Sequence, residues 1–131
     1  MRDTAQRRAI RRVLEEAARP LAPEEVLRAS KAHAPGLGIA TVYRNLKSLA
    51  ASGEVAVVEM PGAPPRYERA GGGHHHHFRC RRCDRVYELS GCVPGVRDLL
   101  PPGFRLDAHE VLLEGTCRDC GRRRGPRQEG R

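Results

Sequence analysis

Two C-x-x-C pairs, Cys80/Cys83 and Cys117/Cys120, constrain the fold of this chain more than any other feature. The spacing lets two thiolates converge on one metal ion, and two such pairs supply the four sulfurs of a closed tetrahedral zinc site. Because 33 residues separate the pairs, a shared ion would close a long loop and contribute directly to folding. We therefore expect structural Zn2+ at these four cysteines; the alternative is a pair of disulfides.

Four consecutive histidines, residues 74–77, follow three glycines and lead into the first cysteine pair. The four-cysteine site is already full, so the histidines indicate further metal positions that are rich in nitrogen ligands. Side chains of a strand alternate between its two faces, which would place His74 and His76 on one face and His75 and His77 on the other. A strand here would supply two separate metal sites, whereas a solvated polar loop would supply none.

The chain has 131 residues and a formal net charge of +8, carried almost entirely by Arg. This charge favours a polyanionic partner, nucleic acid first, although a merely soluble basic surface has the same balance. Few aromatic residues and many Gly and Pro argue against a large core. No apolar run reaches the length of a membrane span, and no apolar signal stretch follows Met1. We therefore expect a cytoplasmic protein without a membrane partner.

Residues 1–69 carry three helical patterns and one hairpin pattern. Apolar residues recur at helical spacing in three segments, and Thr4 or Asp3 can cap the first of them. Turn residues then separate two extended segments. We expect helices at residues 4–18, 23–33 and 40–52, and a hairpin that pairs residues 54–60 with residues 65–68. Three helices followed by a two-stranded hairpin predict a winged helix-turn-helix.

Glycines at 71–73 interrupt these patterns and predict a hinge. Beyond it we expect strands at residues 85–89 and 105–114 and a short helix near residues 93–100. The expected fold class is α+β: an N-terminal winged helix-turn-helix domain followed by a small α/β domain stapled by zinc.

The third expected helix presents polar side chains suited to the major groove of DNA. Arg44 can grip guanine with two hydrogen bonds, Asn45 can read adenine, and Tyr43 can contact a thymine methyl group or a phosphate. The alternative is an ordinary solvated helix face. The candidate DNA-binding residues are Thr41, Tyr43, Arg44, Asn45, Lys47 and Arg66.

Four segments, in order, resemble the ferric uptake regulator family: residues 2–10 (RDTAQRRAI), 38–46 (GIATVYRNL), 66–68 (RYE) and 74–83 (HHHHFRCRRC). The resemblance implies a homodimeric, metal-dependent transcription regulator, usually a repressor. The expected domains are a winged-helix DNA-binding domain at residues 1–69, a hinge at 70–74, a metal-binding dimerisation domain at 75–121 and a disordered basic tail at 122–131.

The resemblance also implies roles for single residues. The four cysteines match the structural zinc site of the family, and Tyr43 and Arg44 match contacts of its recognition helix. A regulatory metal site is implied at Glu68, His75, His77 and Glu88. A further metal site is implied at His74, His76 and His109.

Cys92 is a candidate fourth ligand of that further site. The usual glutamate of the family falls near Gly95, which has no side chain to ligate a metal, and Cys92 lies close by in sequence. The alternative is that Cys92 is a small buried hydrophobic residue.

Two departures from the family pattern leave the sensed metal open. The iron and peroxide sensors of the family resemble one another in having a histidine just before the second helix, where this chain has Arg19-Pro20. Many zinc sensors have a cysteine shortly before the histidine run, and residues 70–73 contain none. The second metal is therefore Zn2+ or Fe2+, with zinc slightly ahead, and the carboxylates keep Mn2+ a candidate. His33 is expected in the last turn of the second helix, as a surface residue.

These observations predict a repressor of metal uptake or homeostasis genes that binds a palindromic operator in double-stranded DNA as a homodimer. No small-molecule substrate is expected. The rivals are a zinc-ribbon-like adaptor that binds nucleic acid or protein without sensing metal, and a zinc hydrolase or deaminase. The chain lacks H-E-x-x-H, and His109-Glu110 does not fit the H-x-E signature of deaminases. We therefore expect no enzyme activity.

Overall fold

The computed structural model describes residues 3–123, and the chain divides into two compact units, Met1–Gly72 and Gly73–Arg131. We describe each unit by itself. The division falls inside the hinge expected at residues 70–74. Within the described residues, no helix combines the length and the apolar character that a membrane crossing requires.

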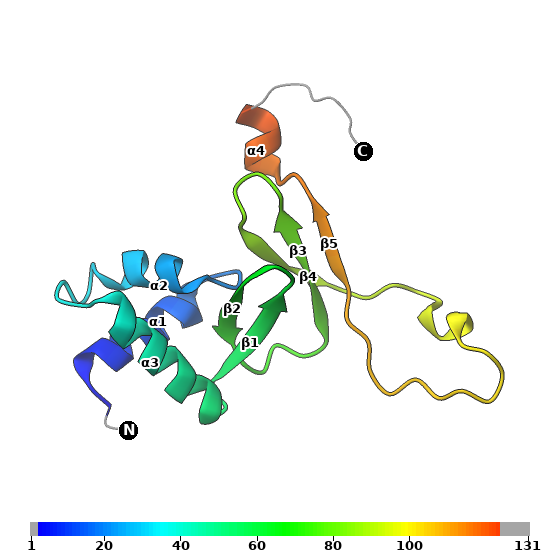
Figure 1. Cartoon of the computed structure of the whole chain (residues 1–131), viewed down its shortest axis with the longest axis horizontal. Coiled ribbons are helices and arrows are strands. Elements are labelled where there is room, and N and C mark those ends of the chain that lie inside the picture. Colours follow the sequence, from blue (N-terminus) through cyan, green and yellow to red (C-terminus); the bar gives the residue numbers. More distant parts are fainter. Residues whose placement is uncertain (1–2, 124–131) are drawn as a thin grey trace. The chain divides into compact units, whose positions relative to one another are not determined.

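The first unit consists of three helices followed by a two-stranded antiparallel sheet, as the winged helix-turn-helix pattern predicts (Figure 1). The hairpin turns at Gly62, whose φ of 72° is the left-handed conformation that glycine adopts without strain. The elements are α1 (Ala5–Glu16), α2 (Pro23–Ser30), α3 (Ile39–Ala51), β1 (Val55–Met60) and β2 (Ala63–Arg69).

Local sequence explains where the first two helices begin. The side chain of Thr4 accepts a hydrogen bond from the backbone N–H of Arg7 at 3.0 Å, so Thr4 is the N-cap of α1. Helix α2 begins at Pro23, which needs no N–H partner in a first turn. Its N-cap, Ala22, has no capping side chain, but Glu25 accepts the Ala22 N–H at 2.9 Å.

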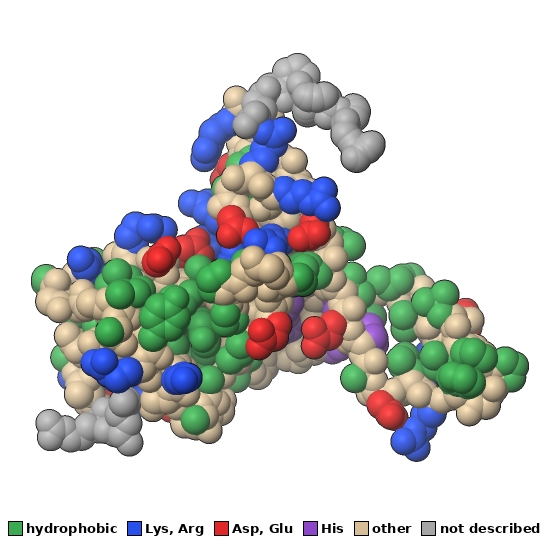
Figure 2. Space-filling model, in the orientation of Figure 1, with side chains coloured by type: hydrophobic (Ala, Val, Ile, Leu, Met, Phe, Trp, Pro, Cys, Tyr) green, Lys and Arg blue, Asp and Glu red, His purple; other side chains and the backbone are tan. Residues whose placement is uncertain are grey.

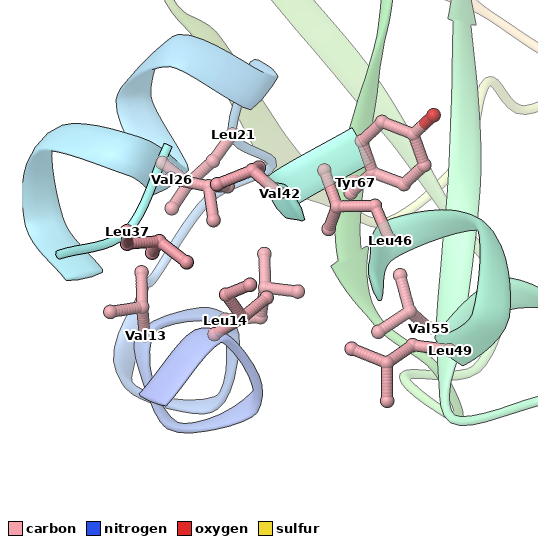
Figure 3. Packing of buried hydrophobic residues seen from close by; sticks show 11 residues of the cluster. Val13, Leu14, Leu21, Val26, Leu37, Val42, Leu46, Leu49, Val55 and Tyr67 are labelled. Atoms are coloured by element: carbon pink, nitrogen blue, oxygen red, sulfur yellow. The ribbon is translucent and has the colours of Figure 1, made fainter. Parts of the chain in front are cut away.

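The core of the first unit lies between the helices and the sheet. Val42, Leu46 and Leu49 form the buried stripe of α3, and Tyr67 of β2 packs against the same cluster. Figure 3 shows these residues in one cluster with side chains of the other two helices, among them Leu14 and Val26. Each fully buried aliphatic side chain stabilises the fold by about 1.5–3 kcal/mol. The core therefore fixes which face of α3 remains available to a partner.

The second unit is a three-stranded sheet of order β4–β3–β5, in which the central strand pairs antiparallel with β4 and parallel with β5 (Figure 1). A short 3₁₀ helix, η1, lies in the long connection between β4 and β5. The elements are β3 (His75–Cys80), β4 (Val86–Ser90), η1 (Val96–Leu99), β5 (Leu112–Gly115) and α4 (Arg118–Arg123).

Two expected boundaries are wrong. Helix α2 ends at Ser30, and His33 lies exposed in the turn that follows, where the carbonyl oxygen of Ser30 accepts hydrogen bonds from the His33 and Ala34 N–H groups at 2.9 Å. Pro35 disfavours helical backbone at Ala34, so the helix does not resume after this turn. The strand expected at residues 105–114 begins only at Leu112. In the observed register His77 pairs with Leu112, so residues 105–111 would have to pair with the glycine-containing segment 70–76.

Two residues of the basic tail expected at residues 122–131 lie in a helix instead. Arg122 and Arg123 form the end of α4, where cationic side chains suit the negative end of the helix. The remaining residues of that expectation lie outside the described part of the chain.

Candidate metal centres and nucleic-acid interface

The four cysteines expected to bind zinc come together in the second unit. Cys80 ends β3, Cys83 lies in the following turn, and Cys117 and Cys120 flank the start of α4. Their sulfur atoms lie within 4.8 Å of one another, and all four thiols are free. The Sγ atoms of Cys83 and Cys117 are 3.8 Å apart, which matches the edge of a tetrahedron with zinc–sulfur bonds of about 2.3 Å.

The environment of this four-cysteine cluster also fits a cation. Burial raises the pKa of Cys80, but hydrogen bonds from the backbone N–H groups of Cys83, Cys117 and Arg82 outweigh it and lower that pKa to about 6. Burial and the neighbouring thiols raise the pKa of Cys120 to about 12. Crowded thiols thus resist full deprotonation unless a positive ion offsets their repulsion. The donor set and spacing fit structural Zn2+.

The alternation expected of the four histidines is confirmed, and the polar-loop alternative is wrong. Strand β3 is paired on both edges. The ring centroids of His74 and His76 are 4.6 Å apart, and those of His75 and His77 are 4.9 Å apart. The strand therefore sorts one tetrapeptide into two imidazole pairs.

The first pair belongs to a His/Cys cluster of His74, His76, Cys92 and His109, whose candidate ligand atoms lie within 4.8 Å of one another. The Sγ atom of Cys92 is 3.3 Å from His74 Nε2, 3.4 Å from His76 Nε2 and 2.8 Å from His109 Nε2. Cys92 is exposed, so the buried-hydrophobe alternative is wrong. Nitrogen and thiolate ligands together suit zinc and similar borderline metals.

His76 differs from the rest of the His/Cys cluster in its surroundings. It is 4% exposed, and its Nδ1 accepts a hydrogen bond from the backbone N–H of Val111 at 3.1 Å. Burial lowers the pKa of His76, and the nearby imidazoles of His74 and His109 lower it further. Neutral His76 therefore contributes a hydrogen bond to the packing of the sheet and also belongs to the cluster.

A cavity of about 670 Å3 adjoins the His/Cys cluster. Its wall contains His74, Cys92 and His109, together with residues of η1 and the connection to β5 such as Arg97 and Asp107. This cavity gives solvent and small solutes access to three members of the cluster.

The second imidazole pair lies on the other face of β3. His75 Nδ1 is 2.9 Å from the carbonyl oxygen of Gly73 and 3.9 Å from Glu88 Oε2. Glu88 pairs with His77 across β3 and β4, so both side chains lie on the face that carries His75. Glu68, half-buried on β2, belongs to the first unit.

Helix α3 presents only some of the expected DNA-binding residues. Tyr43 is 44% exposed, and Arg44 and Lys47 are exposed beside Thr41, whose Oγ1 accepts a hydrogen bond from Arg44 at 3.0 Å. Ile39, in the first turn of α3, is also exposed. Helical spacing gave no signal of this exposure, because Ile39 lies three residues before buried Val42. Figure 2 shows Lys and Arg side chains on several separate parts of the surface, with acidic groups among them.

Asn45 and Arg66 do not fit the expectation that they contact DNA. Asn45 is 5% exposed and its Nδ2 donates to the carbonyl oxygen of Thr41 at 2.9 Å. It lies three residues after Val42, on the buried stripe of the helix. Arg66 is 2% exposed, and its Nη1 donates to the carbonyl oxygen of Pro64 at 2.7 Å. Both side chains hold the fold of the first unit.

Comparison with known proteins identifies the family of this chain. The sequence pattern of the Ferric uptake regulator family matches residues 1–114. A zinc uptake regulation protein of Mycobacterium tuberculosis is 31% identical over 123 residues, which cover 92% of this chain and 95% of that protein. A ferric uptake regulation protein of Campylobacter jejuni is 30% identical over 122 residues, covering 89% of this chain and 78% of that protein.

Solved structures show the same architecture. The ferric uptake regulator Fur of Helicobacter pylori, a structure described as revealing three functional metal binding sites, aligns with a TM-score of 0.74 at 25% identity and covers 92% of this chain and 82% of that one. The names of the Mycobacterium tuberculosis and Campylobacter jejuni relatives refer to zinc and to iron, respectively. The chain belongs to the Ferric uptake regulator family, whose members are metal-responsive, DNA-binding transcription regulators and not enzymes.

Proposed function

We propose that this protein is a cytoplasmic repressor of metal uptake or homeostasis genes, and that metal at His75 and His77 favours its binding to a palindromic operator. The observation that carries this proposal is the pair of imidazoles on one face of β3, 4.9 Å apart, immediately after the hinge. Glu68 and Glu88 complete the proposed regulatory site on the evidence of the sequence.

The hydrogen bond of His75 prepares it to bind a metal. A carbonyl oxygen only accepts, so the 2.9 Å contact with Gly73 requires the proton of a neutral His75 to be on Nδ1. Nε2 then offers its lone pair to a metal, and the hydrogen bond to Gly73 orients the ring.

Linkage supplies the mechanism. Glu68 precedes the proposed hinge and His75 follows it, so one ion bound to both would restrict the orientation of the DNA-binding domain. If DNA prefers that orientation, metal and DNA raise each other's affinity by the same factor. A coupling of about 1–3 kcal/mol corresponds to about 5–150-fold tighter binding.

The proposed DNA contacts are Thr41, Tyr43, Arg44 and Lys47, on the exposed side of α3. The proposed homodimer draws support from apolar side chains exposed on the second unit, where Leu99 is 81% and Phe104 is 66% exposed. Figure 2 shows green side chains gathered in this part of the molecule. Exposed apolar surface of this kind marks interaction sites, which fits a dimerisation domain at residues 75–121.

The proposed metals follow from the ligands. Zn2+ at the four-cysteine cluster is structural, since a full set of four thiolates leaves no open position. Imidazole and carboxylate at the regulatory site suit Zn2+ or Fe2+, with Mn2+ still a candidate. The His/Cys cluster is a further metal site.

The test is operator binding by the double variant His75→Ala/His77→Ala. Operator DNA is first selected from random duplexes by the metal-loaded protein, and binding is then measured by fluorescence anisotropy while zinc, iron(II) and manganese are titrated separately. We expect the double variant to keep its structural zinc and lose the metal response. His33→Ala, an exposed histidine outside the metal clusters, is the control and should respond as the wild type does. A normal response in the double variant would refute the assignment.

A further inference from the structure

We propose that metal at the His/Cys cluster is held by three protein ligands, His74, Cys92 and His109, and that the fourth coordination position belongs to an exogenous ligand. Buried His76 is then a positioning residue that orients the thiolate of Cys92. This inference rests on the further metal site named above and replaces its four-ligand arrangement with an open one.

The hydrogen bond from Val111 determines which nitrogen of His76 is protonated. A backbone N–H only donates, so Nδ1 of His76, 3.1 Å away, must offer its lone pair. A neutral imidazole then carries its proton on Nε2. This Nε2 lies 3.4 Å from the sulfur of Cys92, so its N–H donates to the sulfur. A protonated nitrogen has no lone pair for a metal.

The neighbouring residue shows the opposite arrangement. His75 Nδ1 faces the carbonyl oxygen of Gly73 at 2.9 Å, which places the proton on Nδ1 and frees Nε2 for a metal. One backbone donor and one backbone acceptor thus give two adjacent histidines of β3 different tautomers. His75 is prepared as a ligand, whereas His76 is prepared as a hydrogen-bond donor.

Flipping the His76 ring could free a nitrogen for a metal only by breaking the hydrogen bond from Val111. The flip would place a ring carbon against the Val111 N–H and leave that donor without its acceptor in a region where His76 is only 4% exposed. An unsatisfied buried donor destabilises a fold by about 1–3 kcal/mol. Ligation through His76 Nε2 would therefore oppose the packing of the sheet.

The cavity beside the cluster separates the same residues. His74, Cys92 and His109 line the cavity of about 670 Å3, and His76 is not among its lining residues. A metal held by these three ligands can therefore face the cavity with its fourth position. Sites with three protein ligands accept water or another small ligand, whereas closed four-ligand sites do not. Two imidazoles and one thiolate favour Zn2+ and similar borderline ions.

Cobalt(II) spectroscopy tests this assignment. The protein carries zinc in the four-cysteine cluster and the substitutions His75→Ala/His77→Ala, so that cobalt bound to sulfur reports Cys92. We expect a sulfur-to-cobalt charge-transfer band in the near ultraviolet that Cys92→Ser abolishes. Azide, a small anion, should change the visible cobalt bands as it enters the fourth position.

The variant His76→Gln keeps a side-chain N–H near the sulfur. It should still bind one cobalt per chain, with the same charge-transfer band and the same response to azide, and with affinity lower by about 10–100-fold, as for loss of an outer-shell partner. His74→Ala and His109→Ala should instead change the cobalt spectrum itself.

Two results separate this inference from the proposed further site. If azide leaves the parent spectrum unchanged but alters that of His76→Gln, then His76 is the fourth ligand and the three-ligand assignment is wrong. If the parent protein shows no charge-transfer band, the cluster binds no metal through Cys92 and the further site itself fails. Should His76→Gln not fold, the azide titration of the parent protein still decides between the two arrangements.

Discussion

The start of helix α2 depends on Glu25, and its replacement gives a prediction with a calculable size. The Oε1 atom of Glu25 accepts the Ala22 N–H at 2.9 Å, and its Oε2 atom lies 2.6 Å from Nη2 of Arg19. The side chains of Arg19 and Glu25 are only 19% and 18% exposed. Glu25 therefore supplies one half of a capping box, the bond to the N-cap N–H, and does so in a partly desolvated ion pair.

Glu25→Gln keeps the shape of the side chain and removes its charge. A net contribution of about 1.5–3 kcal/mol is typical of a hydrogen bond to a charged group, and partial exposure of this pair reduces it. We expect the free energy of unfolding to fall by about 1–2 kcal/mol at pH 7. Glu24→Gln, an exposed neighbour in the same helical turn, is the control and should cost less than about 1 kcal/mol.

The sign of the pH dependence follows from the shifted pKa. Burial opposes ionisation of Glu25, but hydrogen bonds from Arg19 and the Ala22 N–H outweigh it and hold the pKa below its usual value of 4.5. A carboxyl with a lowered folded-state pKa stabilises the fold above the unfolded value and loses that contribution as pH falls through the folded value. The difference between wild type and Glu25→Gln should therefore shrink below about pH 4.5.

Urea unfolding followed by far-ultraviolet circular dichroism measures both proteins at each pH. Loss of bound metal in acid affects the two proteins alike, so the difference between them isolates Glu25. An unchanged difference at pH 6 and pH 3.5 would refute the ion-pair reasoning. No difference at pH 6 would show that the cap contributes nothing.

Three more predictions concern the zinc, the DNA contact and the core. Cys117→Ser should lose one zinc per chain by atomic emission and lower the thermal midpoint of unfolding, because the ion links segments 33 residues apart; an unchanged midpoint after zinc loss would contradict a structural role. Arg44→Ala should weaken operator binding by about 1–3 kcal/mol and relax base preference, whereas equal loss on random DNA would indicate a phosphate contact; exposed Arg28→Ala is the control. Leu46→Ala, at a fully buried position, should destabilise the first unit by about 2–5 kcal/mol, and a loss below 1 kcal/mol in urea unfolding would show that the core relaxes around the substitution.

Short-range spacing predicted much of this molecule. The C-x-x-C pairs, the alternation of four histidines and the stripe of Val42, Leu46 and Leu49 each depend on the geometry of one element. Asn45 shows where that reasoning was incomplete. The same helical period that buries Val42 also buries Asn45, and its hydrogen bond to Thr41 makes that burial tolerable.

Hydrogen bonds and strand pairing between distant segments could not be predicted from local spacing. Which ring nitrogen of His76 carries the proton depends on Val111, 35 residues away. No local sequence pattern indicates that these two residues meet. The same is true of β5, whose start depends on which residues of β3 are available to pair. The meeting of Cys92 with His74, His76 and His109 was expected only through the family resemblance, because it depends on how the chain returns from β4.

Strand β3 carries residues of one proposed metal centre on each face and of a third at its end. His75 and His77 lie on one face, His76 on the other, and Cys80 closes the strand. Because the side-chain period of a strand is two, a shift of one residue exchanges the faces. An inserted or deleted residue between His74 and Cys80 would thus give each imidazole to the wrong centre and draw the cysteine out of register. Over evolutionary time this segment can change its residues but has little freedom to change its length.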